Sequence, residues 1–239
     1  AHNITLLRNE GELGIIVSDT LITGKDYKLF RQLILKEFDI KKVIQLPDKI
    51  FKKTEARTHI LLLNKVKSTS STCTLVLANE KGAFLKSLEV SKESLIERMD
   101  FHFWNYSLKR KGRYTTLKQL GTEIKRGNYS YQVLREGRYP YVHSTSFSDE
   151  PRILGNKVRL PQKYRQFASG RGDILMCRVG KRCVGRLAKI TKGEILNSNC
   201  VYRIRVPQKF RAAVWNSLTS KEGAKWIKAY AHGVCAQVI

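Results

Sequence analysis

Glycine-bearing turns rich in arginine, lysine and asparagine are the segments of this chain best suited to binding a ligand. They occur at 125–129, 169–172 and 180–185, and tyrosines follow the first of them closely. Arginine and lysine contact phosphate oxygens, while arginine, asparagine and glutamine match the paired donors and acceptors of base edges. Glycine allows the backbone to approach such a ligand closely. The pattern predicts a nucleic-acid-binding surface.

The candidate DNA contacts are basic, amide, aromatic and hydroxyl residues in or beside these turns, or just after an expected strand. They are Lys125, Arg126, Asn128, Tyr129, Tyr131, Arg138, His143, Ser144, Arg178, Lys181, Arg182 and Arg186. A single arginine among them is explained as well by solvent or phosphate contact, but the clusters favour DNA. The segment 197–199 fits a turn as well as a contact. Asp173 is expected to be structural, because no second carboxylate followed by lysine indicates a nuclease site.

The charge of the chain is concentrated in the region that holds these turns. Residues 101–239 contain 28 Lys+Arg against 7 Asp+Glu, whereas residues 1–100 contain 17 against 13, of a total net charge of +25. A folded segment this basic repels itself, and a polyanion relieves that repulsion. A solvated basic surface is the alternative, and the interleaved aromatic residues favour nucleic acid over it.

Composition limits the other classes of protein. With 239 residues and 42% hydrophobic content, the chain is long enough for two modest domains and is not disordered overall. No apolar run approaches the length of a membrane span and no secretory signal is visible, so neither membrane insertion nor export is expected. The five cysteines form no CxxC pair, and the His232/Cys235 spacing alone cannot complete a metal site. A cytoplasmic location without metal is predicted.

The elements that precede the basic region predict an α/β arrangement. Apolar runs at 13–17, 43–46, 59–63 and 73–78 are expected strands, the first buried on both faces. Apolar residues at helical spacing between 30 and 38, with Arg31 among the polar positions, predict a helix capped by Thr23 or Asp26. Strand–helix–strand implies a parallel pair, and the short link to 59–63 implies a hairpin at the sheet edge. A further helix is expected near 91–99, capped by Ser91.

These segments resemble the end of the catalytic domain in adenine-N6 DNA methyltransferases of restriction-modification systems. The resemblance lies in 11–19, in Val43-Ile-Gln-Leu-Pro47 with Ile50-Phe51, and in 58–65. It implies the tail of a Rossmann-like methyltransferase sheet. A glycine-rich turn for S-adenosylmethionine and a Pro-Pro element for the flipped adenine do not occur in the sequence. The resemblance therefore implies no cofactor in this chain, S-adenosylmethionine in the full-length enzyme, and either the C-terminal portion of a larger enzyme or a relic that is not catalytic by itself.

The basic region resembles a target-recognition domain of type I specificity subunits. The matching segments are 97–104, 117–128, 138–144, 172–180 and 231–239. The residues themselves predict strands at 174–177 and 200–206, with 201, 203 and 205 on one face of the second. Helical spacing predicts two helices, at 210–218 and 226–230, whose tryptophans lie in the core. Ser220 is expected to cap the second helix and Gly233 to end it.

The expected organisation is a methyltransferase-like α/β portion at 1–100 and a mixed α+β target-recognition domain at 101–239. The expected function is sequence-specific recognition of double-stranded DNA for an adenine-N6 methyltransferase. One alternative is a nucleic-acid binder without sequence preference. A second is an assembly module that docks on a restriction or methyltransferase subunit through 1–100, and a third is a complete enzyme.

Overall fold

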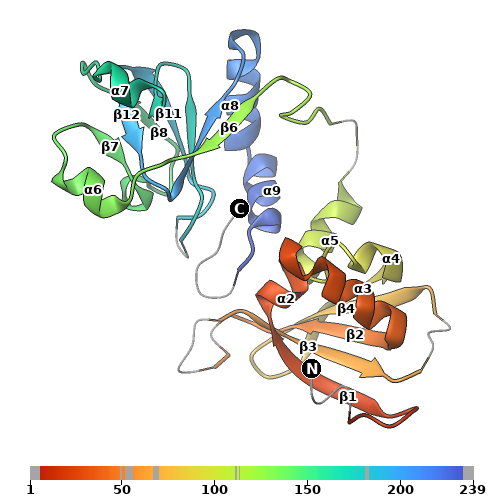
Figure 1. The fold of residues 1–239 in the computed structure, drawn as a ribbon. Helices are drawn as coiled ribbons and strands as arrows, with labels where there is room; N and C mark the ends of the chain where they lie inside the picture. The colour runs from red at the N-terminus through yellow and green to blue at the C-terminus, as the bar shows by residue number, and fades with distance from the viewer. Residues whose placement is uncertain are drawn as a thin grey trace. The chain divides into compact units, whose positions relative to one another are not determined.

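The computed structural model describes residues 6–48, 50–51, 56–66, 70–110, 112, 114–180 and 183–233. The chain divides into two compact units (Figure 1). Among the described residues, the first unit holds the chain up to Arg110 together with His232 and Gly233, and the second holds the chain from 112 to Ala231. Both units are mixed α/β.

The first unit is built on a five-stranded mixed sheet in the order β1-β3-β2-β4-β5. The strands are β1 Glu12–Ser18, β2 Asp39–Gln45, β3 Thr58–Asn64, β4 Thr72–Ala78 and β5 Phe84–Ser91. Only the β2–β4 pairing is parallel, and the other three are antiparallel.

The predicted strands exist, but their neighbours in the sheet differ from the prediction. The parallel pair expected between β1 and β2 is wrong, because β3 lies between them and pairs antiparallel with both. The expected hairpin is confirmed, because β2 and β3 pair antiparallel, but its place at the sheet edge is wrong, since β3 is an interior strand. β1 is the edge strand instead, and its residues alternate between exposed and half-buried rather than being buried on both faces. Ile16, for example, is 54% exposed.

Helices cover one face of this sheet (Figure 1). They are α2 Asp19–Thr23, α3 Lys28–Glu37, α4 Lys92–Leu95 and α5 Phe101–Lys109, with a 3-10 turn η1 at Lys25–Tyr27. The cap predicted for α3 is wrong: its N-cap is Tyr27, without a side-chain hydrogen bond. Ser91 caps α4 as predicted, accepting from the backbone N–H of Ser94, although the helix is shorter than expected. Apolar residues of helices and sheet form one core between them.

Arg31 corrects the amphipathic pattern of α3. Its position among polar residues predicted a solvent-facing side chain, yet the residue is 1% exposed. The guanidinium donates to the carbonyl oxygens of Leu21, Gly24, Ile96 and Glu97 over 2.8–3.0 Å. Burial of the cation is the largest effect on its pKa and lowers it. The side chain ties the start of α3 to the chain that follows α4.

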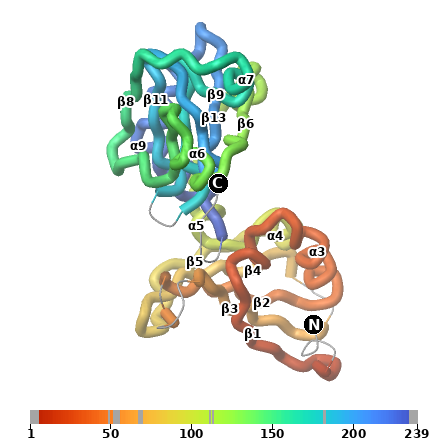
Figure 2. The backbone as a smooth tube through the Cα atoms, turned by 60° about the vertical axis from the view of Figure 1, so that its left-hand side comes forward, coloured from red at the N-terminus to blue at the C-terminus, as the bar shows by residue number. Residues whose placement is uncertain are grey.

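The second unit contains two sheets, one of five strands and one of three. Figure 2 labels β6, β8, β9, β11 and β13 along its backbone. The order β6-β13-β10-β11-β8 joins β6 Glu123–Arg126, β13 Val201–Arg205, β10 Ile174–Cys177, β11 Leu187–Lys192 and β8 Arg152–Gly155. The order β7-β12-β9 joins β7 Tyr141–Val142, β12 Ile195–Asn197 and β9 Ala168–Ser169. The predicted strands at 174–177 and 200–206 are confirmed as β10 and β13. Val201 lies in one core cluster and Tyr202 and Ile204 in another, as the predicted alternation requires.

Four helices complete the described part of this unit: α6 Tyr131–Glu136, α7 Gln162–Arg165, α8 Arg211–Thr219 and α9 Lys221–Tyr230, with 3-10 turns η2 Ser144–Ser146 and η3 Gln208–Phe210. The predicted helix pair is confirmed as α8 and α9, and Trp215 and Trp226 pack against the core as expected. Ser220 caps α9 by accepting from the N–H of Gly223. Gly233 does not end α9, whose C-cap is Ala231.

Within the described residues, no helix is long and apolar enough to cross a membrane. The same residues contain no group of three or more His, Cys, Asp or Glu side chains arranged to hold a metal ion.

Candidate nucleic-acid interface

The turn from Asn197 to Cys200 connects β12 to β13 and is the point at which several candidate DNA contacts meet. Asn197 and Ser198 are 1% and 0% exposed. The N–H of Ser198 donates to Val142, and the N–H of Asn199 donates to Tyr129, each through a backbone carbonyl. Two separate segments are thereby fastened to one turn. Asn197 and Ser198 are thus buried turn residues, whereas Asn199 is half-buried.

Arg126 and Arg178 are both fixed to this turn. Their Nε atoms donate to the carbonyl oxygen of Asn199 over 3.0 Å and 3.2 Å respectively. Arg126 is the last residue of β6 and Arg178 follows β10, so the sheet order places them on either side of β13. Arg126 is exposed and Arg178 is half-buried. The Arg178 guanidinium also lies 6.0 Å from the centre of the Tyr202 ring.

His143 is attached to the same turn by its ring. Its Nδ1 lies 2.9 Å from the Ser198 hydroxyl, and the ring stacks on Tyr131 with centroids 4.3 Å apart. Burial lowers the pKa of His143 below its usual 6.5, so the neutral imidazole is favoured. Ser144 begins the 3-10 turn that follows and is half-buried. An imidazole held in this way presents one nitrogen to the hydroxyl and keeps the Tyr131 ring at the surface.

A polar cavity of about 340 Å³ opens beside the turn. It is lined by Lys125, Arg126, Gly127, Asn128, Gln166, Phe167, Asn197 and Arg203. Gly127 allows the backbone to pass close to the turn: a Cβ there would lie 2.2 Å from the carbonyl oxygen of Ser198 and 2.5 Å from that of Asn197. The exposed amide of Asn128 stands at the rim. Tyr129 is half-buried, with its ring against Tyr164 and Phe167, and burial raises its pKa above 10.

Several cations of this unit are paired with acids. Lys125 and Arg203 both bind Glu123, over 2.7 Å and 2.9 Å. Arg205 binds the carboxylate of Asp173 through two nitrogens, over 2.8 Å and 2.9 Å. Asp173 is 2% exposed and also accepts from the N–H of Gly170, which agrees with the structural role expected for it. These pairs stabilise the fold and cancel positive charge locally.

Two other predicted contacts are not brought to the turn. Arg186 forms an ion pair with Asp149. Arg138 is exposed beyond the end of α6. Lys181 and Arg182 lie outside the described residues.

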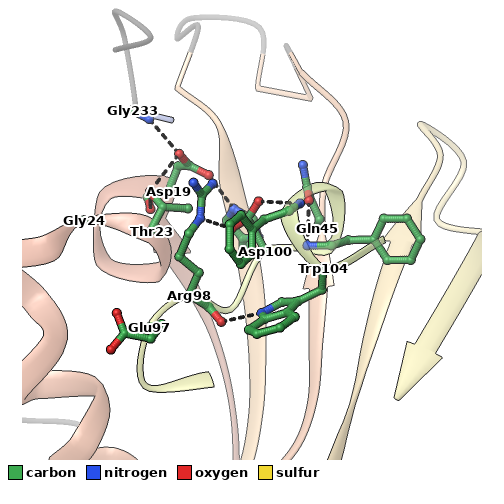
Figure 3. Close-up of polar contacts among 12 residues, drawn as sticks. Asp19, Thr23, Gly24, Gln45, Glu97, Arg98, Asp100, Trp104 and Gly233 are labelled. Carbon is green, nitrogen blue, oxygen red and sulfur yellow. Dashed lines mark hydrogen bonds and ion pairs between the residues drawn. The ribbon is translucent and has the colours of Figure 1, made fainter. Parts of the chain in front are cut away.

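A buried polar cluster in the first unit was missed by the sequence analysis (Figure 3). Asp19 is 1% exposed and His59 is 0% exposed, and the carboxylate lies 2.8 Å from the imidazole Nε2. The second oxygen of Asp19 accepts from the N–H of Gly233 over 2.8 Å, across 214 positions of sequence. Burial alone raises the pKa of Asp19, but the hydrogen bonds and charge of His59 and the Gly233 N–H outweigh it, so the pKa is lowered below 3.8.

Neighbouring polar groups at the same edge of the sheet are also occupied. Asp100 binds Arg98 over 2.7 Å and caps α5 by accepting from the N–H of Phe103. Gln45, at the end of β2, accepts from the N–H of Phe101. The indole of Trp104 donates to the Arg98 carbonyl oxygen (Figure 3). Each of these groups fastens one element of the first unit to another.

Comparisons with known proteins agree on one class. A family model described as N-6 DNA Methylase matches residues 1–138. A putative type II restriction enzyme and methyltransferase of Methanocaldococcus jannaschii is 31% identical over 96 residues, which are 40% of this chain and 8% of that protein. The chain therefore spans a small part of the curated relative that it matches.

Two solved structures are similar to most of the chain. The type IIG restriction endonuclease BpuSI has 10% identity and a TM-score of 0.39, over 93% of this chain and 38% of that one. The type IIL restriction-modification enzyme MmeI, solved in complex with DNA, has 11% identity and a TM-score of 0.46, over 87% and 35%.

Proposed function

Because the chain belongs to the N-6 DNA methylase family, we propose that it serves the DNA-recognition step of an adenine-N6 methyltransferase in a restriction-modification system. The second unit binds duplex DNA and distinguishes its base sequence. It thereby places an adenine for a catalytic domain to extrude from the helix and methylate.

The observation that carries this proposal is the set of groups gathered on the Asn197–Cys200 turn. Arg126, with Asn128 and Tyr131 close to it in sequence, meets Arg178 there. His143, which stacks on Tyr131, joins them from a third segment. Arginine and asparagine are the side chains best matched to guanine and adenine edges and to phosphates. The turn lies in the region of 28 Lys+Arg against 7 Asp+Glu, which supplies long-range attraction to DNA.

The division at residue 100 and the likeness of 101–239 to a type I target-recognition domain are part of the proposal. They are supported by the sequence motifs and by the concentration of basic charge after residue 100. A cytoplasmic location is included, since that is where restriction-modification enzymes meet DNA.

S-adenosylmethionine is the cofactor that the family implies for the full enzyme. The polar groups where β1 and β2 end do not fit it, because Asp19 and Asp100 are buried and bound to protein partners. Such carboxylates cannot hold ribose hydroxyls without breaking those bonds. No catalytic step is assigned to this edge.

The test is a binding assay with labelled oligonucleotides. We expect the chain to bind duplex DNA more tightly than single-stranded DNA or RNA, and to be displaced by some duplex sequences better than by others. The logarithm of affinity should fall linearly with that of salt concentration, as phosphate contacts require. Equal displacement by all sequences would favour the binder without sequence preference. Failure to bind duplex DNA at low ionic strength would refute the proposal.

Two further measurements distinguish an assembly module and a complete enzyme from a DNA-recognition chain. Pull-down of a methyltransferase or restriction subunit by residues 1–100, with no DNA binding by the whole chain, would favour the assembly module. S-adenosylmethionine bound to the purified chain would favour a complete enzyme. Replacing Arg178, Lys181 and Arg182 together by alanine should weaken DNA binding by a few kcal/mol and flatten its salt dependence.

A further inference from the structure

Arg126 and Arg178 are 52 positions apart in sequence and share a single hydrogen-bond acceptor. Both Nε atoms donate to the carbonyl oxygen of Asn199, over 3.0 Å and 3.2 Å. Two cations tied to one oxygen lie close enough to repel, since their Nε atoms are at most about 6 Å apart. Unless another group lowers the local potential, this repulsion raises the free energy of the arrangement.

No acid within the described part of the chain performs that task. Neither arginine forms an ion pair there, and the nearby Glu123 is already bound by Lys125 and Arg203. A carbonyl oxygen orients a guanidinium without cancelling its charge, unlike a carboxylate. The terminal nitrogens of both arginines have no hydrogen-bond partner among the described residues. Four N–H-bearing nitrogens are thus left for a ligand.

The shared acceptor is itself rigidly held. The N–H of Asn199 donates to the Tyr129 carbonyl oxygen over 2.8 Å, and the N–H of Arg178 donates to the carbonyl oxygen of Cys200 over 2.8 Å. Tyr202 belongs to β13, which lies between the strands that lead to the two arginines, and it opposes Arg126 directly in the sheet. Both guanidiniums are therefore oriented before any ligand arrives, which reduces the entropy lost on binding.

We propose that Arg126 and Arg178 form one binding site for a single tetrahedral oxyanion, and that in the DNA complex this anion is a backbone phosphate. The identity of the anion rests on the proposed function, whereas the existence of the binding site does not. Two converging groups that can only donate fit an acceptor-only oxyanion. A guanine edge, by contrast, is satisfied by one arginine alone. The pair therefore positions the duplex, and Asn128 and its neighbours are left to read the bases.

The decisive experiment compares arginine with lysine, which keeps the charge but lacks Nε and the planar fork. Duplex affinity is measured for the wild-type chain, Arg126→Lys, Arg178→Lys and the double variant. Each single variant should lose about 10-fold in affinity, and the double variant little more than either one, because the two side chains act as a unit. The loss should be the same on every DNA sequence. Arg135→Lys is the matched control and should bind like wild type. Arg135 is an exposed residue of α6 that forms no hydrogen bond or ion pair among the described residues.

Two arms identify the source of the anion. Neutral methylphosphonate linkages are placed one at a time along the duplex, and one position should weaken wild-type binding while leaving the double lysine variant unaffected. Separately, inorganic phosphate is titrated into the free chain, and the Nε–H signals of both arginines are followed by NMR. They should shift together with a single affinity, and this arm needs no DNA.

The outcomes separate this inference from the proposed function. Additive losses of affinity in the double variant, or lysine variants that bind duplex DNA as tightly as wild type, would refute the shared anion site while leaving DNA recognition intact. Independent responses of the two arginines to phosphate would overturn it as well. If the chain binds phosphate at the two arginines but does not bind duplex DNA, the proposed function is refuted and the shared anion site is retained.

Discussion

Replacing Gly127 by alanine tests whether the Asn197–Cys200 turn organises the interface. The new Cβ would lie 2.2 Å from the carbonyl oxygen of Ser198 and 2.5 Å from that of Asn197, distances at which backbone must move. Overpacking of this kind costs about 1–3 kcal/mol. The hydrogen bond from the Gly127 N–H to Val201, now 2.9 Å long, is strained in addition, which adds about 1 kcal/mol. We expect a loss of about 2–4 kcal/mol in the free energy of unfolding.

The assay is urea denaturation together with duplex binding. Binding should weaken even in the fraction that remains folded, because displacing the turn displaces the acceptor shared by Arg126 and Arg178. Gly137→Ala is the matched control: it lies in the same unit, its φ of −78° suits alanine, and its Cβ would approach no closer than 3.4 Å. That variant should be neutral or slightly more stable. If Gly127→Ala matched this control in both stability and binding, the role given to the turn would be refuted.

Other predictions concern single side chains. Arg31→Met should lower the free energy of unfolding by at least about 4 kcal/mol in urea denaturation, since four carbonyl oxygens lose their donor; Lys36→Met, at an exposed position of the same helix, is the control. The pKa of Asp19 is lower in the folded protein than in the unfolded chain. The ionised carboxylate therefore stabilises the fold at pH values above the pKa of the unfolded chain, and this stabilisation is lost as pH falls through the pKa of the folded protein. Unfolding measured at and below pH 4 should therefore depend less on pH in Asp19→Asn than in wild type. Asn128→Ala should relax sequence preference more than it lowers overall affinity; equal losses on all duplexes in a competition assay would contradict that. Tyr129→Ala should act in the same way and should also lower stability, because its half-buried ring packs against Tyr164 and Phe167.

The strands of the first unit were predictable because each is a short run of apolar, largely branched residues. Their order was not. β1 and β2 run in the same direction, as a strand–helix–strand unit suggests, but the choice of neighbour depends on which faces and edges are buried. β3 carries a continuous run of four apolar residues and takes an interior place, while β1 contains Gly14 and lies at the edge. β5 was missed because most of its residues are exposed and give no alternation.

Within the interface, the segments of sequence were identified better than the contacts that join them. The turn at 125–129 and Arg178 were singled out from composition, and the structure brings them together. The shared acceptor is a backbone carbonyl, which has no signature in the sequence at all. The pairing of Asp19 with Gly233 is equally invisible, because a hydrogen bond across 214 positions depends on the whole tertiary fold. Arg31 shows the same limitation: its position in the helix predicted exposure to solvent, and its backbone carbonyl partners leave no pattern in the sequence.

The partners of the basic residues give a physical criterion for which of them serve the fold and which serve a ligand. Arg203 and Arg205 are bound by carboxylates, so their charge is largely cancelled where it lies. Arg126 and Arg178 are oriented by a neutral carbonyl, so their full charge is kept and directed. Holding two arginines together without neutralising them does not stabilise the free protein, because bringing like charges together raises its free energy. It becomes favourable once an anion binds between them. The way in which a cation is anchored, more than its exposure, therefore indicates where the proposed contact with DNA lies.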